Sequence, residues 1–460
     1  MKLIIERFGP IKKFEYDISK DLIITYGDNN IGKSYSMQIV YILLKSFIEI
    51  SNDRLYSKYR LNNVVLKLRS MIKNKLLEFD SSDFLEIEIT QFISDLSINI
   101  FSWSFFDSFI NSCNNTFGNM EGIFNQKPII SLSIMDYMLE IDLYSQKISG
   151  TFNIDKTVLK KISSDRQKQR KSPGKHSIYL CKEFETPTEL IEKESFLSVY
   201  KFIKFFKMEL GNVFYLPASR SGIYSGMSAF GSIIAELSKN KAMLTKKIEL
   251  PGISEPISDY FIMLSNIKPR EDERLSDIYS EIENNILKGK VGFNRNKNTL
   301  VYTPENIDHE FEMTEVSSMV SEISPIVAYL KYIMYPNLNA RLYKQNNPCI
   351  VFIEEPEAHL HPKNQIALIE VFSKLHKYNI KLIISSHSNY IFNKLNNLVL
   401  SKALSYDIYS PILLLETSEG SISKELKIDD LGVEDENFLD VSEQLYNERE
   451  RIIFDINSKG

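Results

Sequence analysis

The chain has 460 residues, and its 55 lysines and arginines stand against 60 aspartates and glutamates, so the formal net charge at pH 7 is −5. Hydrophobic residues make up 43% and charged residues 25% of the chain, which excludes wholesale disorder. The three cysteines lie far apart with no CxxC pair, which argues against a disulfide framework and a zinc site. A cytoplasmic protein of several structural units, without a membrane-spanning segment, is therefore expected.

The N-terminal residues predict the start of an α/β domain. Short apolar runs at residues 3–5 and 22–26 are typical of buried strands. The second run leads directly into the loop GDNNIGKS at residues 27–34. A broad apolar pattern from Met37 to Phe47 then predicts a mostly buried helix. Strand, loop and helix in this order form the context in which such a loop binds phosphate.

The loop at residues 27–34 fits G-x-x-x-x-G-K-S, the phosphate-binding loop or Walker A motif. Its glycines let successive backbone N–H groups point at one phosphate, and Lys33 adds a positive charge near the β- and γ-phosphates. The hydroxyl of Ser34 can ligate Mg²⁺. The residues expected to contact a nucleotide here are Gly27, Asn29, Asn30, Gly32, Lys33, Ser34 and Tyr35.

The middle of the chain alternates between helical and strand patterns. Residues 51–128 are predicted as a largely helical insertion, and residues 129–187 as an antiparallel β lobe. Residues 188–310 are predicted as a helical lid that ends in a hairpin. Within the β lobe, residues 156–175 are rich in lysine and arginine. This basic loop is either a solvated surface or a contact to a nucleic-acid backbone.

Residues 311–460 have the rhythm of a parallel sheet. A continuous apolar strand is predicted at residues 349–353, a helix at 363–377 and another apolar strand at 380–384. A strand, a crossover helix and a second strand indicate a parallel sheet that is covered on both faces.

Acidic residues follow the first of these strands, and a histidine follows the second. Glu354 and Glu355 stand at the carboxyl end of their strand, where ligands bind in open α/β folds. One carboxylate can hold Mg²⁺ through water, and the other can orient an attacking water. His387, in the segment SSHS, can contact a γ-phosphate. His359 and His361 have no third ligand nearby, so a metal site there is not expected.

These motifs resemble those of ABC-type ATPases. The segments GDNNIGKS, IVFIEEPEAHLHP and SSHS come in the order found in the branch that contains RecF, SMC and overcoming-lysogenization-defect (OLD) proteins. The resemblance covers residues 1–50 and about 311–400. It implies an α/β fold: an ABC-type P-loop head, with a mixed sheet, helices on both faces and an antiparallel β lobe, interrupted by a helical lid. The expected segments are 1–50, 51–128, 129–187, 188–310 and 311–460.

The resemblance also implies roles for individual residues. Lys33 is expected to bind the nucleotide and to take part in catalysis. Ser34 and Glu354 are expected to hold Mg²⁺, with Glu354 standing where the family usually has the Walker B aspartate. Glu355 is expected to be the catalytic base and His387 the switch histidine. ATP and Mg²⁺ are the expected cofactors.

The family's signature sequence is altered in this chain. In its place stands VSSMVSE at residues 316–322, where Met319 occupies the position of the signature glycine. Ser317 and Ser318, at a helix N-terminus, can still bind the γ-phosphate of ATP held by a second subunit. Alternatively, a serine caps the helix and Glu322 completes a start like a capping box. The residues alone are compatible with both interpretations.

Two further features stay open as well. The segment YLPASRSG at residues 215–222 resembles a segment of the same ATPases, and Arg220 lies either near phosphate or in a plain loop. A residue for the glutamine loop has several candidates without a clear context, namely Gln91, Gln126 and Gln146.

The resemblance implies an ATPase that binds ATP between two copies of the chain, and hence a homo-oligomer. One expected function is a sensor or scaffold that controls a separate effector, a nuclease, in antiphage defence, as in Septu-, PARIS- or retron-associated ATPases. The alternative is a RecF- or SMC-like ATPase that clamps DNA in repair or chromosome maintenance. The residues after His387 lack a convincing acidic set of a TOPRIM nuclease, so no intrinsic nuclease is expected.

Overall fold

The computed structural model describes most of the chain. The described residues are 1–50, 85–88, 90–118, 120–134, 137–151, 177–180, 207–226, 253–268, 270–334, 348–429, 432–434 and 439–458, with isolated residues at 66, 70, 74, 200, 203 and 204. The basic loop at 156–175 lies outside these ranges, so its contact with nucleic acid stays a prediction.

The chain forms two compact units. Unit 1 contains Met1–Gly9 and Ile42–Gly211, and unit 2 contains Pro10–Tyr41 and Asn212–Gly460. The phosphate-binding loop, the two acidic residues after the apolar strand and His387 all belong to unit 2. The candidate site can therefore be described within this one unit.

Unit 1 contains the antiparallel strands predicted after residue 128, joined by β1 from the N-terminal segment. Their order is β7-β6-β5-β1, and the bounds are β1 Lys2–Phe8, β5 Ile129–Ile134, β6 Tyr137–Asp142 and β7 Lys147–Thr151. Each neighbouring pair is antiparallel, as the alternation of apolar residues predicts. Helix α4 (Thr90–Phe117) packs its rings at Phe101 and Phe105 against Phe47, in the part of α1 (Lys33–Glu49) that belongs to unit 1. The short helix α5 (Glu121–Phe124) follows.

One element of unit 1 departs from the sequence-based prediction. Strand β4 (Leu85–Glu88) lies inside the stretch 51–128, which is predicted as largely helical, and pairs antiparallel with β8 (Ser177–Leu180). The sequence of β4 alternates leucine and isoleucine with two glutamates, which is the period of a strand. A four-residue alternation inside a longer helical pattern is a weak signal, because neither period dominates the window.

The sheet of unit 2 is mixed and mostly parallel. Its order is β2-β16-β15-β3-β14-β13-β9, with bounds β2 Ile11–Asp17, β3 Leu22–Tyr26, β9 Asn212–Leu216, β13 Cys349–Glu354, β14 Ile380–Ser385, β15 Tyr409–Leu415 and β16 Ser421–Glu425. Strands β9, β13, β14, β3 and β15 run parallel, whereas β15 and β16 are antiparallel. The strands predicted before the acidic pair and before His387 are thus neighbours, β13 and β14, so their carboxyl ends meet at one edge.

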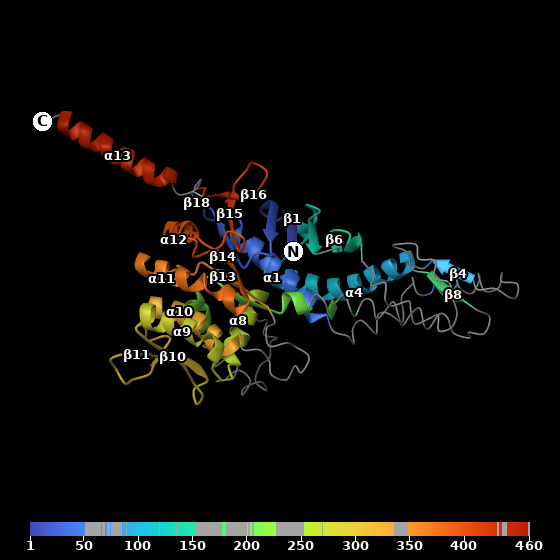
Figure 1. The fold of residues 1–460 in the computed structure, drawn as a ribbon, viewed down its shortest axis with the longest axis horizontal. Coiled ribbons are helices and arrows are strands. Elements are labelled where there is room, and N and C mark those ends of the chain that lie inside the picture. Colours follow the sequence, from blue (N-terminus) through green and yellow to red (C-terminus); the bar gives the residue numbers. More distant parts are fainter. Residues whose placement is uncertain are drawn as a thin grey trace, which may run out of the picture. The chain divides into compact units, whose positions relative to one another are not determined.

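Helices cover both faces of this sheet (Figure 1). Alternate residues of the central strands, such as Val351 and Leu382, share a buried core with helices α8 to α12. Phe352 points to the other face, where its ring contacts Tyr41 of α1. The bounds of these helices are α1 Lys33–Glu49, α8 Glu255–Ser265, α9 Ser276–Ile282, α10 Ser318–Ala328, α11 Pro362–Phe372 and α12 Asn389–Leu400. The α/β fold with a doubly covered sheet is therefore confirmed.

A hairpin, several short turns and the C-terminal helix α13 complete the described part of unit 2. The predicted hairpin is present as β10 (Gly289–Asn294) and β11 (Thr299–Pro304), which β12 (Phe311–Glu312) extends. The others are a 3-10 turn at Glu273–Leu275, π-helical turns at Glu283–Leu287 and Tyr329–Ile333, a 3-10 turn at Leu375–Tyr378, the ribbon β17 Ile428–Asp429 with β18 Gly432–Val433, and helix α13 Leu439–Ser458. Among the described helices, none combines the length and hydropathy that a membrane span requires.

Candidate functional site

The phosphate-binding loop connects the end of β3 to the start of α1. Three of its residues have positive φ, namely Gly27 at 138°, Asn30 at 64° and Gly32 at 100°. A Cβ atom on Gly27 would lie 2.6 Å from the carbonyl oxygen of Leu414, so a larger residue does not fit there. Asn29 and Asn30 are exposed, whereas Ser34 and Tyr35 are partly buried in the first turn of α1. The loop thus has the curvature that turns backbone N–H groups toward one anion.

Lys33 is a buried cation at the centre of this loop. Its Nζ donates to the carbonyl oxygen of Gly27 at 2.9 Å and to that of Asp28, and lies 3.5 Å from Nδ1 of His387. Burial lowers the pKa of Lys33 to about 8, although the nearby carboxylates of Glu355 and Asp28 oppose this effect. Because this ammonium group is shielded from water, its attraction to an anion such as a phosphate is stronger than that of an exposed lysine.

Glu355 and His387 lie next to each other. The distance from Nε2 of His387 to Oε1 of Glu355 is 3.6 Å, and both side chains are partly exposed. The neighbouring His387 is the main cause that lowers the pKa of Glu355, and Lys33 contributes as well. Glu355 is therefore ionised near neutral pH and can accept a proton or orient a water. Its φ of 42° is unusual for glutamate, a type of strain found at functional sites.

Glu354 is buried and points to a different set of partners. Its Oε1 accepts from the hydroxyl of Tyr215 and from Nε2 of Gln38 at 3.4 Å, and its Oε2 accepts from the N–H of Ala218 at 3.3 Å. Burial is the main cause that raises the pKa of Glu354. Gln38 lies one turn after Ser34 on α1, so its hydrogen bond links Glu354 to the helix that carries this serine. Hydroxyl and carboxylate oxygens are ligands that suit Mg²⁺.

Glu357 is a third carboxylate of the site that the sequence does not single out. Its Oε1 accepts from Oγ of Ser386 at 2.8 Å and from the N–H of His387 at 2.6 Å, so it holds the loop that carries the histidine. Its Oε2 is buried, with no hydrogen-bond partner among the described residues, and burial raises its pKa. The signal available in the sequence is its place two residues after Glu355 in EEPE.

The N-terminus of α10 is capped by a serine. The cap residue is Ser317, whose hydroxyl accepts from the N–H of Val320, and both Ser317 and Ser318 are exposed. The capping-box interpretation of Glu322 is wrong, because its carboxylate is buried against Arg220 and Ser221 instead. With Ser317 as the cap, the third helical position is Val320, so Glu322 also lies beyond the position that a capping box requires.

Of the two predicted alternatives for Arg220, the plain loop is wrong, because Arg220 begins a helical segment. Arg220 is completely buried, and its guanidinium donates to protein carbonyl groups, among them those of Glu354 and Glu355; its position near phosphate stays a prediction. Gln91, Gln126 and Gln146 all belong to unit 1, in α4 and in two turns, whereas the site lies in unit 2. Among the described residues, Gln38 is a glutamine that contacts a site residue, Glu354.

One of the two histidines of the segment AHLHP has a structural role. His361 caps α11 by accepting from the N–H of Lys363. Among the described residues, no group of three or more His, Cys, Asp or Glu side chains is arranged to hold a metal ion. The structure thus brings Lys33, Glu355 and His387 together at the carboxyl ends of neighbouring strands. Ser34 and Glu354 directly follow and precede two of these residues in the chain.

The residues present fit a nucleoside triphosphate with Mg²⁺. A desolvated Lys33, a loop with positive φ at three positions and the N-terminus of α1 form a site for phosphates. Ser34 and Glu354 would hold the cation, which supplies neutralisation of phosphate charge when bound. The ring of His387 lies between Lys33 and the ionised Glu355, with one ring nitrogen near each of them.

Comparison with known proteins places the chain in a family. No curated protein matches it. The SMC head bound to the C-winged helix domain of ScpA is 9% identical with a TM-score of 0.36, over 93% of this chain and 97% of that one. The SMC head domain from Thermotoga maritima is 8% identical with a TM-score of 0.35, over 93% and 98%. The family model of the AAA ATPase domain matches residues 1–392, which include Lys33, Glu355 and His387. The chain therefore belongs to the AAA ATPase domain family and is an ATP-hydrolysing enzyme.

Proposed function

We propose that the chain binds and hydrolyses ATP between two of its copies. The observation that carries this proposal is the contact series from Lys33 to His387 at 3.5 Å and from His387 to Glu355 at 3.6 Å. Lys33 and the loop N–H groups bind the phosphates, and Ser34 with Glu354 would hold Mg²⁺. Glu355 orients the attacking water and takes up its proton, since it is ionised near neutral pH.

His387 links the phosphate end of the site to the base. Its backbone N–H is fixed by Glu357 at 2.6 Å, so its ring is held between Lys33 and Glu355. A γ-phosphate that binds Lys33 meets the same imidazole. His387 therefore reports the presence of the γ-phosphate to Glu355 and positions the water between them.

The second copy contributes the N-terminus of α10. Ser317 and Ser318 are exposed, and the helix N-terminus carries the partial positive charge that favours an anion. In this proposal these serines bind the γ-phosphate of ATP held by the Lys33 loop of the partner copy. ATP then joins two copies, and hydrolysis releases them.

The output of this cycle is proposed to be a signal to a separate effector protein, a nuclease, in antiphage defence. Helix α13 supports a protein contact, because large apolar side chains on it are exposed. These are Leu445, Tyr446, Ile452, Ile453 and Phe454. The alternative is a DNA-clamping ATPase of repair, which the basic composition of residues 156–175 favours.

One pair of experiments separates the two functions. Cells that express the chain with its neighbouring genes are challenged with phage, using wild type beside Glu355→Gln and a Leu445→Glu/Phe454→Glu variant of α13. Protection that requires both Glu355 and α13 supports the effector. Phosphate release by the purified chain is measured with and without duplex DNA, at low and high salt. Stimulation by DNA that disappears at high salt, without phage protection, supports the clamp instead.

A further inference from the structure

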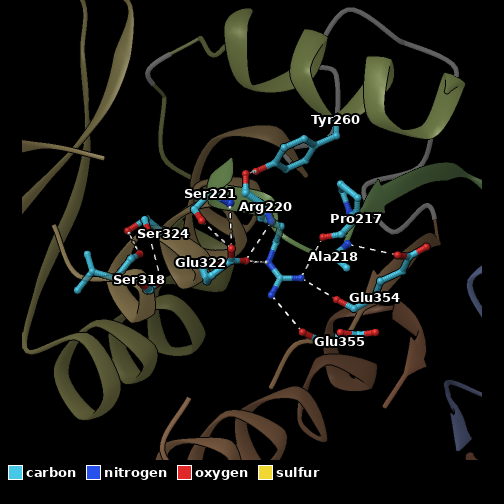
Figure 2. Close-up of polar contacts among 12 residues, drawn as sticks. Pro217, Ala218, Arg220, Ser221, Tyr260, Ser318, Glu322, Ser324, Glu354 and Glu355 are labelled. Atoms are coloured by element: carbon cyan, nitrogen blue, oxygen red, sulfur yellow. Dashed lines mark hydrogen bonds and ion pairs between the residues drawn. The ribbon is translucent and has the colours of Figure 1, made fainter. Parts of the chain in front are cut away.

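Arg220 is a completely buried arginine that joins three parts of unit 2 (Figure 2). Its Nε donates to the carbonyl oxygen of Glu322 on α10 at 3.0 Å. One terminal nitrogen donates to the carbonyl oxygens of Pro217 at 3.1 Å and Glu354 at 2.7 Å, and the other donates to that of Glu355 at 3.2 Å. A planar guanidinium with a fixed fork of donors suits such a junction better than any other side chain.

Two of these bonds fix the backbone on both sides of Glu355. The carbonyl of Glu354 belongs to the peptide plane before Glu355, and the carbonyl of Glu355 belongs to the plane after it. The orientations of these two planes set φ and ψ of Glu355, and φ is 42°. One guanidinium therefore stabilises the left-handed conformation that directs the Glu355 side chain toward His387.

Glu322 connects the same arginine to α10. Its carboxylate is 1% exposed, lies 3.4 Å from Nε of Arg220 and accepts from the N–H of Arg220 at 3.0 Å. It also accepts from the N–H and the hydroxyl of Ser221, at the start of a helical segment. Glu322 lies one turn after Ser318, so one partner of the ion pair belongs to the first turns of α10. The other partner, Arg220, is bonded to the carbonyl groups of Glu354 and Glu355 (Figure 2).

A buried ion pair of this kind is a weak source of stability, because desolvation of two charges offsets their attraction. It does define the position of Arg220 relative to α10. We propose that Arg220 is a positioning residue that holds Glu355 in its catalytic orientation and, through Glu322, links that orientation to α10. This inference rests on the proposed role of Glu355 as the base. A shift of α10, on contact with ATP of a second copy, moves Glu322, Arg220 and the Glu355 backbone together.

The test uses Arg220→Lys and Glu322→Gln in the full chain. Lysine keeps the charge but concentrates its donors on one nitrogen, which cannot reach all four carbonyl groups that Arg220 contacts. Glutamine keeps the shape of Glu322 and removes its charge. For both variants kcat for ATP is expected to fall about 10²-fold, the effect of a misplaced catalytic group, while KM changes little. Phosphate release gives both constants, and thermal unfolding is measured in parallel.

The matched control is Glu283→Gln. Glu283 pairs with Lys331 at 3.1 Å, and both side chains are buried, so the variant also removes one charge from a buried ion pair. Its contacts are with Val291 and Lys331, not with Arg220, Glu354 or Glu355. Its melting temperature is expected to fall like that of Glu322→Gln, with kcat near wild type. If kcat of the Arg220 and Glu322 variants falls no further than that of this control, the inference is overturned.

Glu355→Gln separates failure of this inference from failure of the proposed site. An inactive Glu355→Gln beside a fully active Arg220→Lys overturns the positioning role alone. A normally active Glu355→Gln overturns the base and the positioning role together. If Arg220→Lys does not fold, kcat of Glu322→Gln relative to Glu283→Gln decides the outcome.

Discussion

Lys33 combines deep burial with a position among carbonyl groups, and this makes its protonation depend on the ligand. In the nucleotide-free protein its pKa is lowered from 10.5 to about 8, mainly by desolvation. A bound phosphate stabilises the protonated form and raises the pKa again. At a pH between the pKa of Lys33 in the free protein and its pKa in the complex, Lys33 is mostly deprotonated without ATP and protonated with ATP bound.

ATP binding is therefore expected to take up a proton above about pH 8. The affinity falls as pH rises through this range, by up to about tenfold per pH unit. Isothermal titration calorimetry in buffers of different ionisation enthalpy measures the uptake directly. Lys33→Arg, which stays protonated, is the control and should show no uptake. An affinity of the wild type that stays constant from pH 7 to 9.5 would contradict the assignment.

The two acidic residues at the end of β13 are expected to behave differently when each is changed to glutamine. Glu355→Gln removes the proton acceptor and should slow hydrolysis roughly 10²–10⁴-fold, with ATP binding retained. Glu354→Gln should instead weaken two properties, the Mg²⁺ dependence of turnover and the retention of bound nucleotide, because one charged oxygen ligand is lost. Turnover and binding of a fluorescent ATP analogue, measured across Mg²⁺ concentrations, distinguish them. Equal effects of both variants on binding would argue against separate roles.

The phosphate-binding loop is an element in which backbone geometry decides what fits. Gly27 has φ of 138°, and its Cβ position is 2.6 Å from the carbonyl oxygen of Leu414 on the neighbouring strand β15. The strand before the loop and the helix after it are recognised from their apolar patterns. The close approach of β15 is not visible in the sequence, because β15 comes much later in the chain.

Gly27→Ala is expected to lower the free energy of unfolding by roughly 2–3 kcal/mol, since both φ and the contact with β15 are incompatible with alanine. Gly122→Ala is the matched control. Gly122 lies in helix α5 with nothing within 4 Å of its Cβ position. Its substitution should be neutral or stabilise the protein by up to about 1 kcal/mol. Chemical denaturation of both variants gives the comparison, and equal stability would show that the loop tolerates a side chain.

Helix α10 offers a prediction at the same scale. If its exposed N-terminus completes the site of a second copy, Ser318→Arg and Lys33→Ala should each be inactive alone. A mixture should regain part of the hydrolysis, because one of its composite sites keeps both intact halves. Phosphate release by the mixture, with mixed oligomers verified by two affinity tags, is the measurement. Without recovery in verified mixed oligomers, Ser317 and Ser318 would serve as a helix cap only.

The whole molecule is expected to change its assembly with ATP. Glu355→Gln binds ATP but does not release it by hydrolysis, so its copies should stay joined in Mg-ATP and separate in its absence. Light scattering on a sizing column gives the particle mass in both conditions. Lys33→Ala is the control and should show one mass throughout. An unchanged mass of Glu355→Gln, with bound ATP demonstrated, would contradict the proposal that ATP joins two copies.

The sequence alone determined the features that depend on neighbouring residues. Strand β3, the loop and the start of α1 were predictable because one continuous segment carries them, and so were Glu354, Glu355 and His387, which directly follow apolar strands. Tertiary structure decided the rest. Arg220 and Glu322 are 102 residues apart, and Tyr215 and Glu354 are 139 apart. No local pattern tells a buried arginine which carbonyl groups it will meet, because desolvation and geometry select its partners only when β9, β13 and α10 pack together.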